Sequence, residues 1–358
     1  MIPSKHFQAK DISGWFVLFL VISLIPACAP TLKEIPVSKE AVEAEKEKQR
    51  EIAVVTFLER QESLNRVAYP LLVGATPFCR NDLRNFCGFE VHDKKLYKEE
   101  YADIVARRYR LEKQPTVRYV HPNFPAAMAG LKVNDKILEI NKKRIEDAQQ
   151  VAVILRELDP SEGQPVHLII QRENQIFELD IACLSACKYS VLLVTHDSVN
   201  AFADGNRVGI TTGLMRFIQS DEELSLVVSH EIAHNALNHV TKQTGNVLLG
   251  SILDILIAST TGVGTRGTFG QIGGLVYSKE FEKEADYAGT YIAARAGFDI
   301  TNAANIWRRM AAEYPGSIED TFLASNPSSP ERFLAIDQAV YEIKEKQSRG
   351  DPLLPEKK

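Results

Sequence analysis

The central pattern of this sequence is His230-Glu231-Ile232-Ala233-His234, an H-E-x-x-H motif inside a run that we expect to form one helix. Side chains four residues apart lie on the same face of a helix, so both imidazoles can reach a single Zn2+ ion. The glutamate between them then points toward a metal-bound water. This arrangement predicts a zinc hydrolase, with His230 and His234 as metal ligands and Glu231 as the general base. The alternative is a chance match on an ordinary helix, but burying these three side chains without a metal would be costly.

The residues around the motif support a helix. Residues 220–223 fit a capping box with acids in the first turn, and a largely apolar run continues over residues 224–240. A metzincin would have glycine and histidine where this chain has Leu237 and Val240, and His239 is one position away from the required place. The third metal ligand must therefore come from elsewhere in the chain.

A second expected helix, over residues 278–289, can supply that ligand. Glu282 and Asp286 are four residues apart and share one helix face. We expect Glu282 to be the third ligand, and Asp286 to accept the outer N–H of a ligand histidine and fix its tautomer. For Glu280 and Glu284 we expect a solvated acidic face. Small residues on or near that side would let the two helices approach closely: Ala285, Gly289 and Ala293.

H-E-I-A-H at residues 230–234 and E-K-E-A-D-Y-A-G at residues 282–289 resemble the HtpX-like and Oma-like zinc metallopeptidase family. This gluzincin family includes the CAAX prenyl proteases and is marked by H-E-x-x-H and a downstream E-x-x-x-D. The resemblance covers about residues 190–340. It includes residues 199–205, similar to the family's N-A-F-A segment, and residues 327–332, similar to its H-P-S-x-x-x-R segment.

The resemblance implies a mainly helical zincin-type domain with a small edge sheet. The strand expected over residues 207–212 would be the edge strand along which a substrate backbone lies. Asn326 departs from the family, whose members often have histidine there. Asn326 and Arg332 are weak candidates for oxyanion or substrate contacts, and a structural ion pair is the other role expected for Arg332. The substrate-pairing positions of the edge strand would be Val208, Gly209, Ile210 and Thr211.

Residues 124–141, which read FPAAMAGLKVNDKILEIN, carry a second pattern. A helical run over residues 147–158 and strands near residues 166–171 and 176–181 follow it. This order resembles a PDZ domain of the bacterial protease type. Asn134 stands in place of the usual glycine, and asparagine tolerates the left-handed conformation that a turn there requires.

A PDZ domain binds an extended peptide as an added strand between a sheet strand and a helix. We find no clear Gly-Leu-Gly-Phe carboxylate loop upstream of Thr116, so binding of a free C-terminus stays open. A PDZ-like spacer without a peptide ligand is the alternative. Candidate groove or core positions on the expected helix are Val151, Ile154 and Leu155.

Residues 1–28 form an expected targeting segment. An apolar run over residues 15–25 follows two lysines; it has the length of a signal-peptide core and is short for a membrane span. The run ends at Cys28 in a sequence that resembles a bacterial lipobox, whose cysteine becomes the lipidated N-terminus. A plain cleaved signal and an uncleaved anchor are the alternatives, and all three place the rest of the chain outside the cytoplasm. Ala29, at the sorting position of enterobacterial lipoproteins, favours an outer-membrane anchor.

Four cysteines remain after Cys28: Cys79, Cys87, Cys183 and Cys187. An even number in an exported chain indicates disulfides, and four cysteines allow three pairings that the sequence does not distinguish. A zinc site is the alternative, but the C-x7-C and C-x3-C spacings match zinc ribbons poorly. In both cases the cysteines flank residues 88–182 and would fasten the base of an inserted domain.

The composition is that of an ordinary soluble protein, with 45% hydrophobic and 25% charged residues in a chain of 358, long enough for two domains. A net charge of -5 without a basic stripe predicts no nucleic-acid partner. Between the two metal helices, an apolar stretch over residues 247–258 precedes a glycine-rich segment over residues 261–274. No Gly-Lys-Ser/Thr follows, which disfavours a phosphate loop. A lid over the cleft and a surface loop are equal alternatives.

The expected fold class is α+β, a mainly helical metallopeptidase domain with an inserted β-rich PDZ-like domain. The expected parts are a lipoprotein signal peptide (1–27), a linker (28–37), the N-terminal helical part of the peptidase (38–99), the PDZ-like domain (100–182), the zinc metallopeptidase domain (183–345) and a C-terminal tail (346–358).

The expected function is that of a zinc endopeptidase with one Zn2+ per subunit, lipid-anchored in the bacterial envelope and facing the periplasm. Family resemblance suggests unfolded or misassembled envelope proteins as substrates, with a peptide segment bound to the PDZ-like domain. The competing hypothesis is a zinc-binding adaptor or chaperone-like protein with latent or no peptidase activity. Glu231 favours the enzyme, because a purely structural zinc site needs no general base.

Overall fold

A computed structural model describes residues 32–33, 35–80, 82–158, 163–244, 277–313 and 330–356. The chain divides into two units, residues 1–47 and residues 48–358. The expected signal segment with Cys28, the glycine-rich segment and Asn326 lie outside the described residues. None of the helices among the described residues is long and apolar enough to span a bilayer.

The helices are α2 (Lys39–Gly74), η1 (Thr76–Phe78), η2 (Lys94–Leu96), α3 (Glu99–Tyr109), α4 (Pro125–Met128), α5 (Ala148–Glu157), α6 (Thr212–Phe217), α7 (Asp221–Ala236), α8 (His239–Thr244), α10 (Lys279–Arg295), α11 (Ala303–Glu313) and α12 (Pro330–Arg349). The strands are β1 (Leu83–Phe86), β2 (Phe89–His92), β3 (Thr116–Val120), β4 (Lys136–Ile140), β5 (Lys143–Arg144), β6 (Val166–Arg172), β7 (Gln175–Ile181), β8 (Leu184–Cys187), β9 (Ser190–Val194), β10 (Ala201–Ala203) and β11 (Arg207–Thr211).

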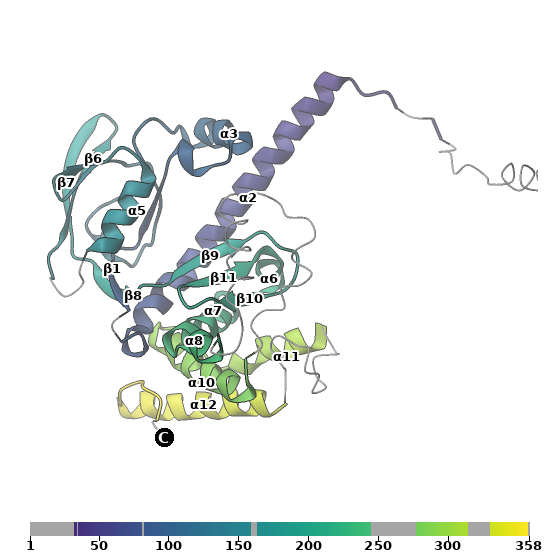
Figure 1. The fold of residues 1–358 in the computed structure, drawn as a ribbon, viewed down its shortest axis with the longest axis vertical. Helices are drawn as coiled ribbons and strands as arrows, with labels where there is room; N and C mark the ends of the chain where they lie inside the picture. The colour runs from purple at the N-terminus through teal and green to yellow at the C-terminus, as the bar shows by residue number, and fades with distance from the viewer. Residues whose placement is uncertain are drawn as a thin grey trace, which may run out of the picture. The chain divides into compact units, whose positions relative to one another are not determined.

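The strands of the described residues form three sheets. The largest is antiparallel and has the order β2-β3-β4-β6-β7, with β5 paired to β4. The second has the order β10-β11-β9, and β1 and β8 form a separate antiparallel ribbon. Helices α7, α10, α11 and α12 pack together apart from the largest sheet (Figure 1). This confirms the predicted α+β class, with a mainly helical part and a β-rich part.

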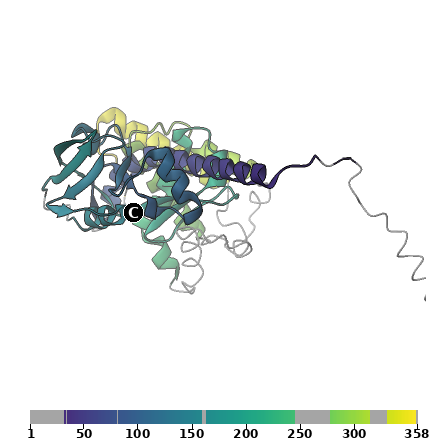
Figure 2. The ribbon, with the colours of Figure 1, turned by 90° about the horizontal axis from the view of Figure 1, so that it is seen from above.

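The β-rich part has a hydrophobic core of its own, which includes Val117, Ile137 and Leu168. In both views its sheet lies at one end of the second unit (Figures 1 and 2). The sheet begins upstream of position 100, where we expected the PDZ-like domain to start, because β2 pairs with β3 and α3 is inserted between them. Asn134 has a φ of 75°, the left-handed conformation predicted for this turn.

The helical part is built on the contact between α7 and α10. Ala285 and Ala293 of α10 are fully buried, in agreement with the expected close packing. A Cβ atom on Gly289 would lie 3.0 Å from the backbone N and Cα of His230, which is too close for ordinary packing. Glycine at this position therefore lets the backbone of α10 approach the H-E-x-x-H motif.

The prediction that residues 207–212 form an edge strand is wrong. β11 is the middle strand of its sheet, antiparallel to β10 and parallel to β9. The pairing of β10 with β11 is a local hairpin. The parallel pairing of β11 with β9 needs a crossover connection, and no local sequence pattern indicates that pairing. The terminal strand that contacts α7 is β10. The four positions expected to pair with substrate lie inside the sheet: Val208, Gly209, Ile210 and Thr211.

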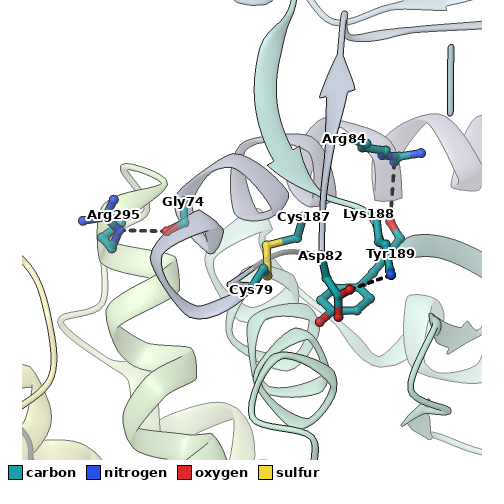
Figure 3. Close-up of a disulfide and its surroundings, with 8 residues drawn as sticks. All are labelled: Gly74, Cys79, Asp82, Arg84, Cys187, Lys188, Tyr189 and Arg295. Carbon is teal, nitrogen blue, oxygen red and sulfur yellow. Dashed lines mark hydrogen bonds and ion pairs between the residues drawn. A yellow bond between two sulfur atoms is a disulfide. The ribbon is translucent and has the colours of Figure 1, made fainter. Parts of the chain in front are cut away.

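Two disulfides close the base of the β-rich part. Cys79 pairs with Cys187, and Cys87 pairs with Cys183. The alternative of a zinc site made of the four cysteines is therefore wrong. Figure 3 shows the first of these bonds beside the β1–β8 ribbon, which connects the β-rich part to the helical part. The two covalent links fix both strands of this connection.

We expect a non-reducing peptide map to contain the Cys79–Cys187 and Cys87–Cys183 peptides. The Cys87→Ala/Cys183→Ala variant loses a link between positions 96 residues apart. It should lose about 2–5 kcal/mol of unfolding free energy, because the unfolded chain gains conformational freedom. Denaturant unfolding measures this loss. A Cys79–Cys87 peptide in the map, or unchanged stability, would contradict the pairing.

Candidate metal centre

Helix α7 carries the H-E-x-x-H motif in its buried second half. Its N-terminus is capped by Ser220, whose Oγ accepts a hydrogen bond from the Glu223 backbone N–H at 3.3 Å. The Glu223 carboxylate in turn accepts the backbone N–H of Gln219 at 2.8 Å. This agrees with the predicted capping box, except that Glu223 accepts the backbone N–H of Gln219 instead of that of Ser220. The cap fixes where the helix begins, and hence which face carries the motif.

Three side chains from α7 and α10 converge on one point. Nε2 of His230 lies 3.0 Å from Nε2 of His234, and each nitrogen lies 3.5 Å from an oxygen of Glu282. Metal–ligand bonds of about 2.0–2.1 Å in tetrahedral geometry place ligand atoms about 3.3 Å apart. The three residues could therefore hold one metal ion, and all three are buried.

The carboxylate of Glu282 is the clearest sign that the cluster suits a metal. Its side chain is fully buried, and neither oxygen accepts a hydrogen bond within the described part of the chain. Oε2 lies 3.0 Å from Nη1 of Arg332, which is an ion-pair distance without hydrogen-bond alignment. A buried carboxylate left in this state is costly, and a cation between it and the two imidazoles removes the cost.

Asp286 holds the outer face of the first histidine. Its Oδ1 lies 2.9 Å from Nδ1 of His230, an ion-pair distance, and a proton on this nitrogen would leave the lone pair of Nε2 facing the metal position. Arg332 of α12 donates two hydrogen bonds to the same carboxylate, at 2.7 and 2.8 Å. Burial opposes ionisation of Asp286, but Arg332 and His230 together outweigh burial and lower the Asp286 pKa to about 2. The expected ion-pair role of Arg332 is thus present in the structure.

Glu231 lies between the two histidines and is also buried. Burial disfavours its carboxylate form and raises its pKa to about 7. A carboxyl group with a pKa near neutrality can accept a proton and return it, as a general base must. For His230, burial lowers the pKa, but the neighbouring carboxylates of Asp286 and Glu282 together outweigh burial and raise it to about 10. A metal ion at this site must therefore displace a proton from His230.

The second histidine has neighbours that the sequence did not reveal. Nδ1 of His234 lies 3.1 Å from Nδ1 of His239, whose Nε2 lies 3.1 Å from Oε2 of Glu284. The ring of Tyr277 stacks on His234 with a centroid distance of 3.8 Å. Sequence reasoning considered His239 only as a metzincin ligand and expected a solvated role for Glu284. Asn238 is the residue in the sequence that could have indicated this contact. Asparagine readily adopts the left-handed conformation that ends a helix, and here that turn ends α7 and brings His239 back to the site.

A pocket of about 370 Å³ lies on the β-rich part. Three features form its walls: the β1–β2 connection, one face of α5, and strand β9 with part of α2. The connection reads Phe86-Cys87-Gly88-Phe89. Of the expected helix positions, Val151 and Leu155 line the pocket.

Two parts of the chain match models of known protein families. Residues 171–340 match the model of peptidase family M48, and residues 116–172 match a PDZ domain model. The mitochondrial metalloendopeptidase OMA1 of Schizosaccharomyces pombe is 26% identical over 241 residues, which cover 65% of this chain and 71% of that protein. The putative beta-barrel assembly-enhancing protease of Vibrio cholerae is 32% identical over 140 residues, which cover 35% of this chain and 29% of that protein.

Coverage differs among these relatives. The chain spans 32% of OMA1 of Arabidopsis thaliana, to which it is 28% identical over 158 residues, covering 44% of this chain. Among solved structures, the HtrA3 PDZ domain bound to a phage-derived ligand is 18% identical with a TM-score of 0.23, covering 29% of this chain and 88% of that chain.

A chain with this helical fold and this group of buried ligands is a metalloendopeptidase. Within that class, its catalytic part is a domain of peptidase family M48, and it also carries a PDZ domain. It is similar to the OMA1 peptidases and to the beta-barrel assembly-enhancing proteases.

Replacing Glu282 by glutamine keeps the size of the side chain but removes the anionic ligand. We expect Glu282→Gln protein to be purified with almost no bound metal, because two neutral imidazoles alone hold zinc weakly. Elemental analysis of the purified protein measures this. Glu280→Gln, an exposed change on the same helix, is the matched control and should keep the metal. Full metal content in Glu282→Gln would remove Glu282 from the ligand set.

Proposed function

We propose that this chain is a zinc-dependent endopeptidase of the bacterial cell envelope that hydrolyses peptide bonds in unfolded or misassembled proteins. The observation that carries the proposal is the buried Glu282 carboxylate, which faces the Nε2 atoms of His230 and His234. Two imidazoles and one carboxylate are a donor set typical of catalytic zinc, and we propose one ion per subunit. The relatives from Vibrio cholerae and Yersinia pestis, which are named beta-barrel assembly-enhancing proteases, support a role in the envelope.

The proposed reaction uses Glu231 as the proton carrier. When bound, the zinc ion supplies a water molecule of lowered pKa and polarises the scissile carbonyl group. Glu231 accepts a proton from the attacking water and then donates it to the nitrogen of the leaving amine. Its burial suits this role, because a pKa of about 7 favours transfer in both directions near neutral pH.

Arg332 has a supporting role in this proposal. Its guanidinium donates to Asp286 and lies beside Glu282, so its positive charge offsets two buried carboxylates. We therefore favour charge compensation for Arg332 over contact with an oxyanion. A contribution of Asn326 to substrate or oxyanion binding stays a prediction from sequence.

The pocket beside α5 supports a role for the PDZ domain in holding substrate. β2 is a terminal strand of its sheet in the described part of the chain, and it lines the pocket opposite α5. An extended peptide could add to β2 and place its side chains against α5. Because Val191 of β9 lines the same pocket, a bound peptide would also contact the peptidase part. We propose that this pocket holds one segment of a long substrate.

The two disulfides support an oxidising compartment such as the periplasm. We keep a lipid anchor at Cys28, facing the periplasm from the outer membrane, as part of the proposal. The Cys28→Ser variant should then lose the anchor, and the protein should move from the membrane to the soluble fraction. Membrane fractionation with mass analysis of the N-terminal peptide measures this. Unchanged partition and no lipid mass would contradict the anchor.

Blocking the pocket should impair cleavage of long substrates. Ala152 is exposed on α5 and lines the pocket, whereas its exposed neighbour Val153 does not. We expect Ala152→Trp to reduce cleavage of unfolded protein while cleavage of short peptides stays unchanged, because a short peptide needs only the metal site. The matched Val153→Trp variant should leave both rates unchanged. Equal loss for long and short substrates in Ala152→Trp would argue against substrate holding.

The proposed activity is tested by incubating unfolded casein with the exported chain and with its Glu231→Gln variant, while zinc is measured in both. We expect cleavage by the native chain, loss of cleavage in Glu231→Gln of at least about 100-fold, and zinc in both proteins. Bound zinc with no cleavage by either protein would instead favour an adaptor or a latent enzyme.

A further inference from the structure

We propose that His239 and Glu284 form a positioning relay that fixes the tautomer and orientation of His234. The inference rests on the proposed metal centre and deepens it. The relay runs from the Glu284 carboxylate to Nε2 of His239, and from Nδ1 of His239 to Nδ1 of His234. Both steps have a length of 3.1 Å. It gives the second histidine ligand a support comparable to the one that Asp286 gives His230.

The proton positions along the relay follow from hydrogen-bond chemistry. A ligand histidine must offer the lone pair of the nitrogen that faces the metal, which is Nε2 in His234. Its proton is then on Nδ1, and Nδ1 of His239 must accept it. A neutral His239 therefore carries its own proton on Nε2, which donates to the carboxylate of Glu284. One assignment of protons satisfies every step.

The surroundings hold His239 in place. Its side chain is fully buried, and its ring stacks on Phe281 with a centroid distance of 4.5 Å and an interplanar angle of 18°. Asn238, with a φ of 56°, ends α7 and starts the turn into α8, so His239 comes back beneath His234. Glu284 lies on α10, the helix that also carries Glu282. The relay therefore links the two metal helices through α8.

Two sets of residues thus support the two histidine ligands from opposite ends. His230 is held by a buried aspartate, whereas His234 is held by a buried histidine whose carboxylate partner is half exposed. Because the Glu284 side chain is half exposed, it can be replaced without leaving a cavity in the core. This difference allows the relay to be tested separately from the fold.

The experiment measures zinc affinity by competition with a chromophoric chelator, together with the visible spectrum of the Co2+-loaded protein. His239→Leu removes the acceptor for His234 and should weaken zinc binding about 10- to 100-fold. His239→Asn should keep most of the affinity, because its Oδ1 can occupy the place of Nδ1 and accept the same hydrogen bond. The Co2+ spectrum should change in His239→Leu and remain close to native in His239→Asn.

Glu284→Ala provides a second test that does not depend on a core substitution. We expect a loss of affinity near the lower end of that range, about 10-fold, and no loss in the matched control Glu280→Ala. The relay would be overturned if His239→Leu and His239→Asn bound zinc equally well. It would also be overturned if Glu284→Ala and Glu280→Ala had equal zinc affinities. Failure of the native chain to bind zinc would instead overturn the proposed metal centre, so the two failures are distinguishable.

Discussion

The burial of two carboxylates, Glu282 and Asp286, next to two imidazoles is the constraint on which the rest of the structure depends. Buried charges persist only when partners compensate them. Asp286 accepts two hydrogen bonds from Arg332, whereas the oxygens of Glu282 lie in an ion pair with Arg332 but accept no hydrogen bond from the described residues. This asymmetry makes Glu282 the candidate carboxylate ligand of a metal ion.

Four of the described helices contribute to that arrangement. α7 and α10 supply the candidate ligands, and glycine at position 289 allows their backbones to approach. α12 supplies Arg332, and α8 supplies His239 after the left-handed turn at Asn238. The disulfide-linked β1–β8 ribbon then joins the helical part to the β-rich part, and strand β9 lines the pocket beside α5. The β-rich part and the helical part are therefore connected by disulfide-linked strands and by a shared pocket.

The sequence predicts those features that depend on local periodicity. The four-residue spacings of His230 with His234, and of Glu282 with Asp286, place each pair on one helix face, and Asn134 adopts the expected left-handed turn. Features that depend on non-local pairing were not predictable. β11 is central because of a crossover to β9, and the cysteine pairing depends on how β1 meets β8. The contact between His239 of α8 and Glu284 of α10 joins residues 45 positions apart.

X-ray absorption at the zinc K-edge of the purified native protein tests the central claim most directly, since it reports the ligands of the bound ion. The account predicts a first shell made only of nitrogen and oxygen at about 2.0–2.1 Å, with the outer-shell scattering of two imidazoles. A sulfur shell at about 2.3 Å, or the signal of a single imidazole, would contradict a centre formed by His230, His234 and Glu282.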